Sequence, residues 1–249
     1  AKLIGVLHSC HYFEPFENAG SVTFNYEYYY WFKYSREIDT FVVGTLSQKT
    51  DLIKKLKEHD VFVPNIAVIP PGYTETDDLN CVDEFQRKRN SIISVSRLTK
   101  QKGVDILVKS VIKAHEFNHD ITLDLYGDGD KEFINELKTM IYENRAGNYI
   151  HFMGHQDVKN VYKTYELYVG LSFCESFGLS MLEALSAGNA FVGFNTKYGN
   201  REFIKNGYNG YVMEFNITKD IHNLGSVIDN VAQKIVDIFN DTDQLKKFQ

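Results

Sequence analysis

Short apolar runs rich in β-branched residues alternate along this chain with longer segments in which apolar residues recur at helical spacing. Runs of the first kind predict buried strands, and segments of the second kind predict helices. Because the strands are separated by helices, the pattern is typical of βαβ units, and the sequence predicts the α/β class with a parallel sheet. Strands are expected at 3–7, 40–43, 66–69, 92–95, 121–126, 149–152, 166–171, 190–193 and 210–213, and helices at 22–37, 46–58, 104–117, 131–145, 157–164, 178–187, 200–206 and 226–240.

A linker is expected at Pro70-Pro71-Gly72 and the acidic, polar tract that follows it. We therefore expect residues 71–249 to form a Rossmann-like parallel sheet domain with helices on both faces. Residues 1–70 hold too few strands for a complete partner and are expected to be the remnant of a second Rossmann-like domain. The chain starts at Ala1 almost inside a strand and stops inside the expected final helices, so we expect a piece of a longer protein with truncated C-terminal helices.

Composition narrows the class of protein. Hydrophobic residues make up 43% and charged residues 24%, an ordinary globular balance, and the formal net charge of −6 disfavours a general nucleic-acid binder. No apolar run reaches the roughly 18 residues of a membrane span, and no secretory signal is visible. Cys10, Cys81 and Cys174 are too few for a disulfide framework, so we expect reduced thiols in a cytoplasmic protein, with Cys174 as a small packing residue.

Two cations lie on the loop that follows the predicted strand 92–95. Arg97 comes just after this strand, and Lys102 precedes the next helix. Ligands of doubly wound sheets bind outside the carboxyl ends of the strands. An Arg fork and a Lys point charge on that loop suit a phosphate or a diphosphate, with ordinary solvated surface charge as the alternative.

Two glutamates eight residues apart frame the start of another helix. Glu175 should lie in a strand-to-helix loop, and Glu183 inside the helix among apolar neighbours, where a carboxylate needs a partner. The unpaired amides of Phe177, Gly178 and Leu179 should point out of the helix N-terminus, which favours an anion or a sugar oxygen. The alternative is a capped helix with a solvated Glu183.

Six motifs follow one another along the chain: RLxxxKG at 97–103, YGxG at 126–129, a strand ending in Gly154-His155, E-x7-E at 175–183, YGN at 198–200 and GYNGYV at 207–212. In this order and spacing they resemble a GT-B glycosyltransferase of the large, retaining GT4 family, and the resemblance covers residues 66–215. The stretches VLHSCHYFE, NYEYYYWF and FNTKYGNREFIKNGYNGY further resemble the catalytic A-type subunits of the accessory Sec system that add N-acetylglucosamine to serine-rich bacterial adhesins. Wall teichoic acid poly(polyol-phosphate) glycosyltransferases are similar too and stand second.

The resemblance implies a role for each of these residues. Arg97 and Lys102 would hold the donor diphosphate, Glu183 the ribose hydroxyls, and Glu175 the donor sugar beside the amides of Phe177, Gly178 and Leu179. Gly154 and His155 would face the uracil, and His8 would reach the reacting centre, with His11 as the alternative. The catalytic set would thus be His8, Arg97, Lys102 and Glu175.

The resemblance also implies the reaction and its partners. It implies transfer from a UDP-sugar with retention, without a metal or other cofactor, to a protein or polymer hydroxyl. A B-type partner subunit, no nucleic acid, and a cytoplasmic place at the inner face of the membrane are expected. A non-catalytic UDP-sugar-binding partner subunit on the same fold, and a zinc peptidase, are the competing functions.

Three features could mislead. His115-Glu116-Phe117-Asn118-His119 matches the zinc-protease pattern HExxH, but its helix should stop at about residue 118. Asp128 and Asp130 read as a DxD metal site, yet they open a helix, where Asp is a routine cap. The aromatic cluster Tyr26–Phe32 cannot be buried on one helical face, so we expect part of it in the core and part in an acceptor groove or partner contact.

Overall fold

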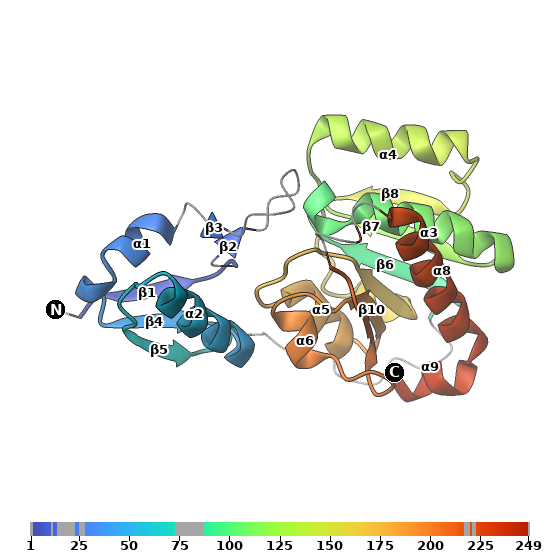
Figure 1. Cartoon of the computed structure of the whole chain (residues 1–249). Helices are drawn as coiled ribbons and strands as arrows, with labels where there is room; N and C mark the ends of the chain where they lie inside the picture. The colour runs from blue at the N-terminus through green and yellow to red at the C-terminus, as the bar shows by residue number, and fades with distance from the viewer. Residues whose placement is uncertain are drawn as a thin grey trace.

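The computed structural model describes residues 2–10, 12–13, 23–24, 28–72, 87–216, 220 and 223–248. It holds two parallel sheets in separate units, which we call the N-terminal unit (residues 2–72) and the C-terminal unit (residues 87–248) (Figure 1). The predicted α/β class is therefore confirmed.

The sheet of the N-terminal unit has the order β1-β4-β5, with all strands parallel. β1 is Ile4–Leu7, β4 is Thr40–Val43 and β5 is Asn65–Val68. One face of this sheet packs against α1 (Tyr29–Lys33) and α2 (Leu46–Glu58), with Phe41 and Leu52 fully buried between them. α2 begins at Thr45, whose hydroxyl accepts a hydrogen bond from the Gln48 amide at 3.1 Å.

The sheet of the C-terminal unit has the order β11-β10-β9-β6-β7-β8, again with all strands parallel. The inner strands β6, β7, β9 and β10 are buried along almost their whole length, as expected for a sheet covered on both sides, and most of their residues are apolar. The strands are β6 (Ser91–Val95), β7 (Thr122–Tyr126), β8 (Ile150–Gly154), β9 (Leu167–Gly170), β10 (Ala190–Phe194) and β11 (Gly210–Met213).

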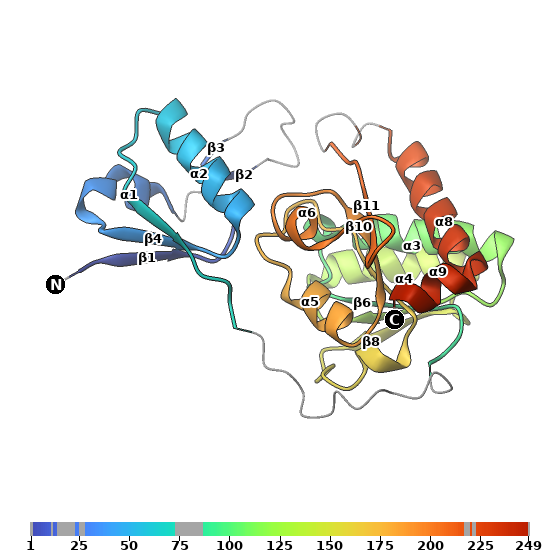
Figure 2. The ribbon, with the colours of Figure 1, turned by 90° about the horizontal axis from the view of Figure 1, so that it is seen from below.

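Helices cover both faces of this sheet (Figure 2). On one face, α3 (Val104–Phe117), α4 (Lys131–Glu143), α8 (Leu224–Asn240) and α9 (Thr242–Phe248) enclose the larger core. On the other face, α5 (Leu179–Ser186) and α6 (Gly199–Phe203) enclose a smaller core in which tyrosines prevail. The loops that hold the candidate site residues lie at the carboxyl ends of the strands.

Most predicted elements lie within three residues of the observed ones, but two predicted helices are wrong. Residues 22–37 hold a short strand, β3 (Thr23–Phe24), paired with β2 (Tyr12–Phe13), then α1 and a 3-10 turn at Ser35–Glu37. The described helical turn covers only Tyr29–Lys33, because the chain is paired as a strand at Thr23–Phe24 and tightens into a 3-10 turn after residue 34. Residues 157–164 contain only a 3-10 turn, η5 (Tyr162–Thr164), because the buried Tyr162 anchors this segment in the core instead.

The aromatic cluster divides as expected between core and surface. Tyr28 and Phe32 are buried, whereas Tyr29 and Tyr30 are 54% and 65% exposed. Tyr26 lies outside the described residues.

One glycine fixes how the loop after β6 enters α3. Gly103 has φ +63°, and a Cβ there would lie 2.3 Å from the Leu171 carbonyl oxygen at the end of β9. This contact brings the loops after β6 and β9 together. A side chain at this position would force them apart.

We predict that Gly103→Ala destabilises the chain by about 2 kcal/mol or more, because the left-handed conformation alone costs roughly 1–2 kcal/mol for a residue with a Cβ. The urea midpoint of unfolding measures this. Gly147→Ala is the matched control, since a Cβ there meets nothing within 4 Å. Equal midpoints for the two variants would contradict the close approach of these loops.

Candidate functional site

The candidate site lies where the strand order of the larger sheet reverses. β7 and β8 follow β6 on one side, whereas β9, β10 and β11 lie on its other side. Such a reversal opens a crevice outside the carboxyl ends of the two strands that flank it, which is where ligands bind in doubly wound sheets. Here those strands are β6 and β9. The loops that follow them carry Arg97, Lys102 and Glu175.

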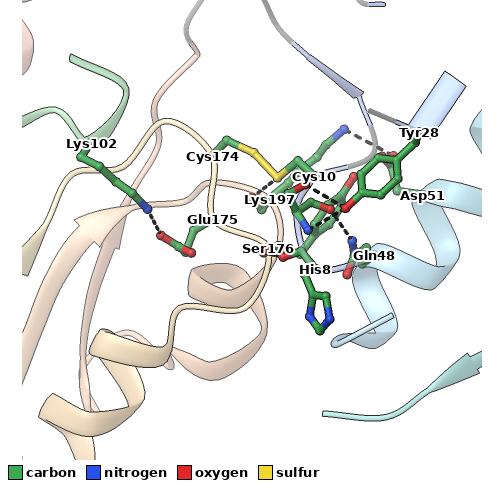
Figure 3. Close-up of a disulfide and its surroundings, with 12 residues drawn as sticks. His8, Cys10, Tyr28, Gln48, Asp51, Lys102, Cys174, Glu175, Ser176 and Lys197 are labelled. Atoms are coloured by element: carbon green, nitrogen blue, oxygen red, sulfur yellow. Dashed lines mark hydrogen bonds and ion pairs between the residues drawn. A yellow bond between two sulfur atoms is a disulfide. The ribbon is translucent and has the colours of Figure 1, made fainter. Parts of the chain in front are cut away.

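Lys102 and Glu175 form an ion pair across this reversal point. The Lys102 ammonium lies 2.7 Å from a Glu175 carboxylate oxygen, and the two side chains are only 18% and 22% exposed. Figure 3 shows the two side chains pointing toward one another from their separate loops. The Phe173 amide also donates to the Gln101 carbonyl at 3.0 Å, so the backbone fixes the two loops together. The structure thus brings together a cation and a carboxylate that lie 73 residues apart.

Arg97 lies two residues beyond β6 and is exposed. The neighbouring Leu98 is buried and pairs with Gly129, and its amide donates to the Asp128 carbonyl at 2.9 Å. The backbone beside Arg97 is therefore fixed while its guanidinium faces solvent. A solvent-exposed guanidinium on a fixed backbone is well placed to bind an anionic ligand.

The start of α5 combines a tight turn with an exposed end. Gly178 has φ +87°, and a Cβ on it would lie 3.3 Å from Glu175 Cγ, so the turn brings Glu175 close to the first turn of the helix. Phe177 is buried and its ring meets that of Phe203, whereas Leu179 is 46% exposed. The N-terminal end of α5, whose first amides have no partner within the helix, therefore lies beside the Glu175 side chain.

Glu183 has the partner that its apolar surroundings predict. The Tyr162 hydroxyl donates to a Glu183 carboxylate oxygen at 2.8 Å, and Tyr162 itself is 1% exposed. Beneath the same loops, burial raises the pKa of Tyr168, whose hydroxyl lies 2.9 Å from that of Ser180. Both glutamates of the E-x7-E motif are thus held by a neighbour, one by an ammonium and one by a phenol.

Gly154 and His155 lie at the end of β8, and both are exposed. β7 separates β8 from β6, so these residues lie two strands away from the Lys102 loop. Gly154 has φ +72°, and its carbonyl accepts from the Gly127 amide at 2.8 Å. At about 4.8 Å per strand, β8 and β6 are roughly 10 Å apart.

The N-terminal unit contributes the end of β1. His8 follows this strand directly and is exposed, and its carbonyl accepts a hydrogen bond from the Ser176 hydroxyl at 2.6 Å. Figure 3 shows its imidazole pointing away from the disulfide described next. The backbone of His8 therefore lies against the Glu175 loop, whereas the reach of its imidazole to the reacting centre stays a prediction. His11 lies outside the described residues.

The expectation of reduced thiols is wrong for two of the three cysteines. Cys10 and Cys174 form a disulfide between residues 164 positions apart, which links the loop after β1 to the loop after β9 (Figure 3). Cys174 is thus a cross-link beside Glu175 instead of a small packing residue. Each cysteine lies a few residues beyond a strand end, but nothing in the sequence indicates that the ends of these two sheets face one another. Cys81 lies outside the described residues.

The HExxH match at 115–119 and the DxD match at 128–130 have structural roles in the fold. α3 ends at Phe117, so His119 lies outside the helix; the His115 ring stacks on Tyr149 at 3.5 Å, and its Nδ1 lies 3.0 Å from the Ile121 carbonyl oxygen. Asp130 caps α4 by accepting from the Phe133 amide at 3.0 Å.

The part of the chain that the structure describes holds neither a cluster of metal ligands nor a helix that could span a membrane. No group of three or more His, Cys, Asp or Glu residues there could hold a metal ion. None of its helices has both the length and the apolar character that a membrane crossing requires.

The sequence of this chain is similar to those of known proteins. The model of the "Glycosyl transferases group 1" family matches residues 80–233. A curated UDP-N-acetylglucosamine–peptide N-acetylglucosaminyltransferase GtfA subunit from Streptococcus gordonii is 35% identical over 249 residues, which is all of this chain and 48% of that protein. The chain therefore spans about half the length of such relatives. A Staphylococcus aureus poly(ribitol-phosphate) α-N-acetylglucosaminyltransferase is 24% identical over 94% of this chain and 44% of its own.

Two solved structures are similar over the whole chain. The pneumococcal O-GlcNAc transferase GtfA in complex with UDP and GlcNAc superposes with a TM-score of 0.88 at 32% identity, covering 100% of this chain and 47% of that one. A GtfA/B complex gives a TM-score of 0.83 at 35% identity, covering 100% of this chain and 48% of that one. The GT-B fold expected from the sequence is thereby confirmed.

The disulfide leads to a direct chemical prediction. In protein kept in air, a peptide map without reductant should recover the Cys10 peptide joined to the Cys174 peptide, because the two loops meet only in the folded chain. Dithiothreitol should separate the pair, and Cys10→Ser should abolish it. Recovery of both cysteines as free thiols from folded, air-exposed protein would contradict the contact between these loops.

Proposed function

This chain belongs to the glycosyl transferases group 1 family, and we propose that it is the nucleotide-sugar-binding half of a retaining, UDP-sugar-dependent hexosyltransferase. The proposed reaction moves N-acetylglucosamine to Ser or Thr hydroxyls of a serine-rich protein. The observation that carries this proposal is the Lys102–Glu175 pair at the reversal point of the sheet, inside the segment that matches the family. The Lys102 ammonium can bind a diphosphate, and the Glu175 carboxylate can accept hydrogen bonds from sugar hydroxyls. The N-terminus of α5 beside them also favours an anion.

The proposed chemistry depends on positive charge at the leaving group. Arg97 and Lys102 would bind the donor diphosphate and stabilise the charge that develops as UDP leaves. The amides of Phe177, Gly178 and Leu179 at the α5 N-terminus add to that field. The acceptor hydroxyl would attack from the face that the diphosphate leaves, and the diphosphate would take its proton. Because these groups supply the charge, we propose that transfer needs no divalent ion or other cofactor.

The remaining residues would orient the donor. Glu175 would accept hydrogen bonds from sugar hydroxyls, with Lys102 as its counterion, and Glu183 would accept them from the ribose while Tyr162 fixes its carboxylate. Gly154 and His155, two strands away, would face the uracil. His8 would reach the sugar from the N-terminal unit. We propose that residues 1–70 belong to an acceptor-side domain and that residues 71–249 bind the donor.

Partners and location follow from the same proposal. One similar protein was solved as a GtfA/B complex, so we propose a B-type partner subunit for the protein that contains this chain. We also propose a cytoplasmic place at the inner face of the membrane. The Cys10–Cys174 disulfide is a feature that this location does not favour, since the cytoplasm keeps most thiols reduced.

We predict that the chain binds UDP in the presence of EDTA and that Lys102→Ala and Arg97→Ala each weaken binding about 10- to 100-fold. This is the loss expected when a charge-assisted hydrogen bond to phosphate disappears. Titration calorimetry with UDP measures it. Lys100→Ala is the matched control, because Lys100 lies on the same turn but pairs with Glu136 at 3.6 Å.

The control variant should bind UDP as tightly as the parent. No UDP binding by the parent, or equal affinities in the parent and both site variants, would refute the proposed site. A demand for added Mg²⁺ would refute metal independence alone.

Donor and acceptor call for a separate experiment on the longest natural form of the chain, with and without a B-type subunit. We expect transfer from UDP-N-acetylglucosamine to a serine-rich peptide, and slower transfer from UDP-glucose. A poly(ribitol phosphate) polymer is the competing acceptor. Transfer to the polymer alone would assign the chain to the teichoic acid branch. UDP-sugar binding without any transfer would make it a binding subunit.

A further inference from the structure

One carboxylate of the N-terminal unit lies against the C-terminal unit. Asp51, in α2, accepts a hydrogen bond from the Tyr198 hydroxyl at 2.8 Å and pairs with the Lys197 ammonium at 3.3 Å. Its side chain is 17% exposed and Tyr198 is 1% exposed. A carboxylate taken this far out of water is costly unless it is paired. The position of α2 is therefore tied to residues 197 and 198.

The backbone of those two residues holds Glu175. The Glu175 amide donates to the Lys197 carbonyl at 2.9 Å, and the Glu175 carbonyl accepts from the amides of Tyr198 and of Gly199, the latter at 3.0 Å. Residues 175 and 198 form an isolated parallel bridge. A Cβ on Gly199 would lie 1.9 Å from the Phe177 carbonyl oxygen, so the two loops are in close contact. Any shift of the 197–199 loop must therefore shift Glu175.

A second carboxylate ties the same segment to the start of α2. Glu202, in α6, accepts from the Leu46 and Ser47 amides at 3.0 and 2.9 Å and from the Ser47 hydroxyl at 2.5 Å. Burial alone would raise the pKa of Glu202, but these hydrogen bonds outweigh it and leave the pKa lowered. The N-terminus of α2, where a negative charge is favoured, thus binds a group from the other unit.

These contacts form one continuous chain from α2 to the candidate site. Asp51 holds Tyr198 and Lys197, their backbone holds Glu175, and Glu175 pairs with Lys102. We infer that Asp51 is a positioning residue for Glu175, through which the N-terminal unit sets the donor-sugar contact of the C-terminal unit. This inference rests on the proposed function, since it takes Glu175 as the group that contacts the donor sugar. Asp51 itself touches neither Lys102 nor the start of α5 in these contacts.

If Asp51 positions Glu175, loss of Asp51 should weaken binding of the sugar but not binding of the nucleotide. Arg97, Lys102 and the end of β8 lie on other loops than 197–199, and a bound diphosphate can replace Glu175 as the counterion of Lys102, so UDP alone should bind about as well whether or not Asp51 holds its partners. The sugar of a UDP-sugar should lose the contact that depends on the position of Glu175. The preference for UDP-N-acetylglucosamine over UDP, expressed as the ratio of the two affinities, therefore reports on Asp51.

Titration calorimetry with both ligands tests this on the parent chain, Asp51→Asn and Tyr198→Phe. We expect the affinity for UDP to stay within about twofold and the preference to fall about five- to tenfold in each variant, the loss expected for one weakened hydrogen bond to a charged group. Glu58→Gln is the matched control, because Glu58 lies on the same helix but pairs only with Lys54 and Lys55 in the described contacts. It should keep the parent preference.

A positioning role also predicts non-additivity. Glu175→Gln should lower the preference by itself, and adding Asp51→Asn to it should lower the preference no further, because residues that act through one another do not add. A residue that only stabilises the fold would lower both affinities together and would add to Glu175→Gln. The thermal midpoint of each variant identifies that case.

The possible outcomes are distinct. If Asp51→Asn fails to fold, Tyr198→Phe decides by the same criteria, since it removes one hydroxyl only. An unchanged preference, or an equal loss for UDP and UDP-N-acetylglucosamine, overturns the inference while the proposed function stands. A parent chain that binds neither ligand refutes the proposed function, and the inference with it.

Discussion

The candidate site depends on the ion pair between Lys102 and Glu175. It joins the loops after β6 and β9, the two strands between which the order of the larger sheet reverses. A pair with both side chains about four-fifths buried contributes little net stability, because desolvation offsets most of the attraction. Its effect is geometric, since it holds an ammonium and a carboxylate at one point beside the free amides of α5. A diphosphate can meet the first of these groups and a sugar hydroxyl the second.

The same loop is also held from the other unit. The Cys10–Cys174 disulfide and the Ser176 hydrogen bond to the His8 carbonyl involve the two chain neighbours of Glu175, and Asp51 contacts the 197–199 loop, which is hydrogen-bonded to Glu175. Several described contacts between the two units therefore lie where the proposed donor sugar would bind. Because of these contacts, the geometry of the site depends on the relative position of the two units. The position of Glu175, the proposed sugar-binding group, therefore depends on both units.

The sequence predicted the elements of this fold well, and for a physical reason. Strands such as 40–43 and 210–213 are short apolar runs bounded by polar residues, and their period is local information. Lys102 and Glu175 could be found because each lies on a loop between such a run and the next helix. Asp51 and Glu202 could not, since they look like solvated helix residues until the two units meet. The same holds for Cys10 and Cys174, because hydrophobic period says nothing about which sheet ends face one another. The predicted helix at 22–37 failed because Thr23–Phe24 pairs with Tyr12–Phe13, a contact that the local hydrophobic period does not report.

The central claim is that the groups around the Lys102–Glu175 pair bind the diphosphate of a nucleotide. A crystal structure of the chain with UDP tests it most directly. The account predicts diphosphate oxygens within hydrogen-bond distance, about 3 Å, of the Lys102 ammonium and the Arg97 guanidinium, in front of the first turn of α5. A nucleotide bound at another edge of the sheet, with its phosphates away from both cations, would contradict it.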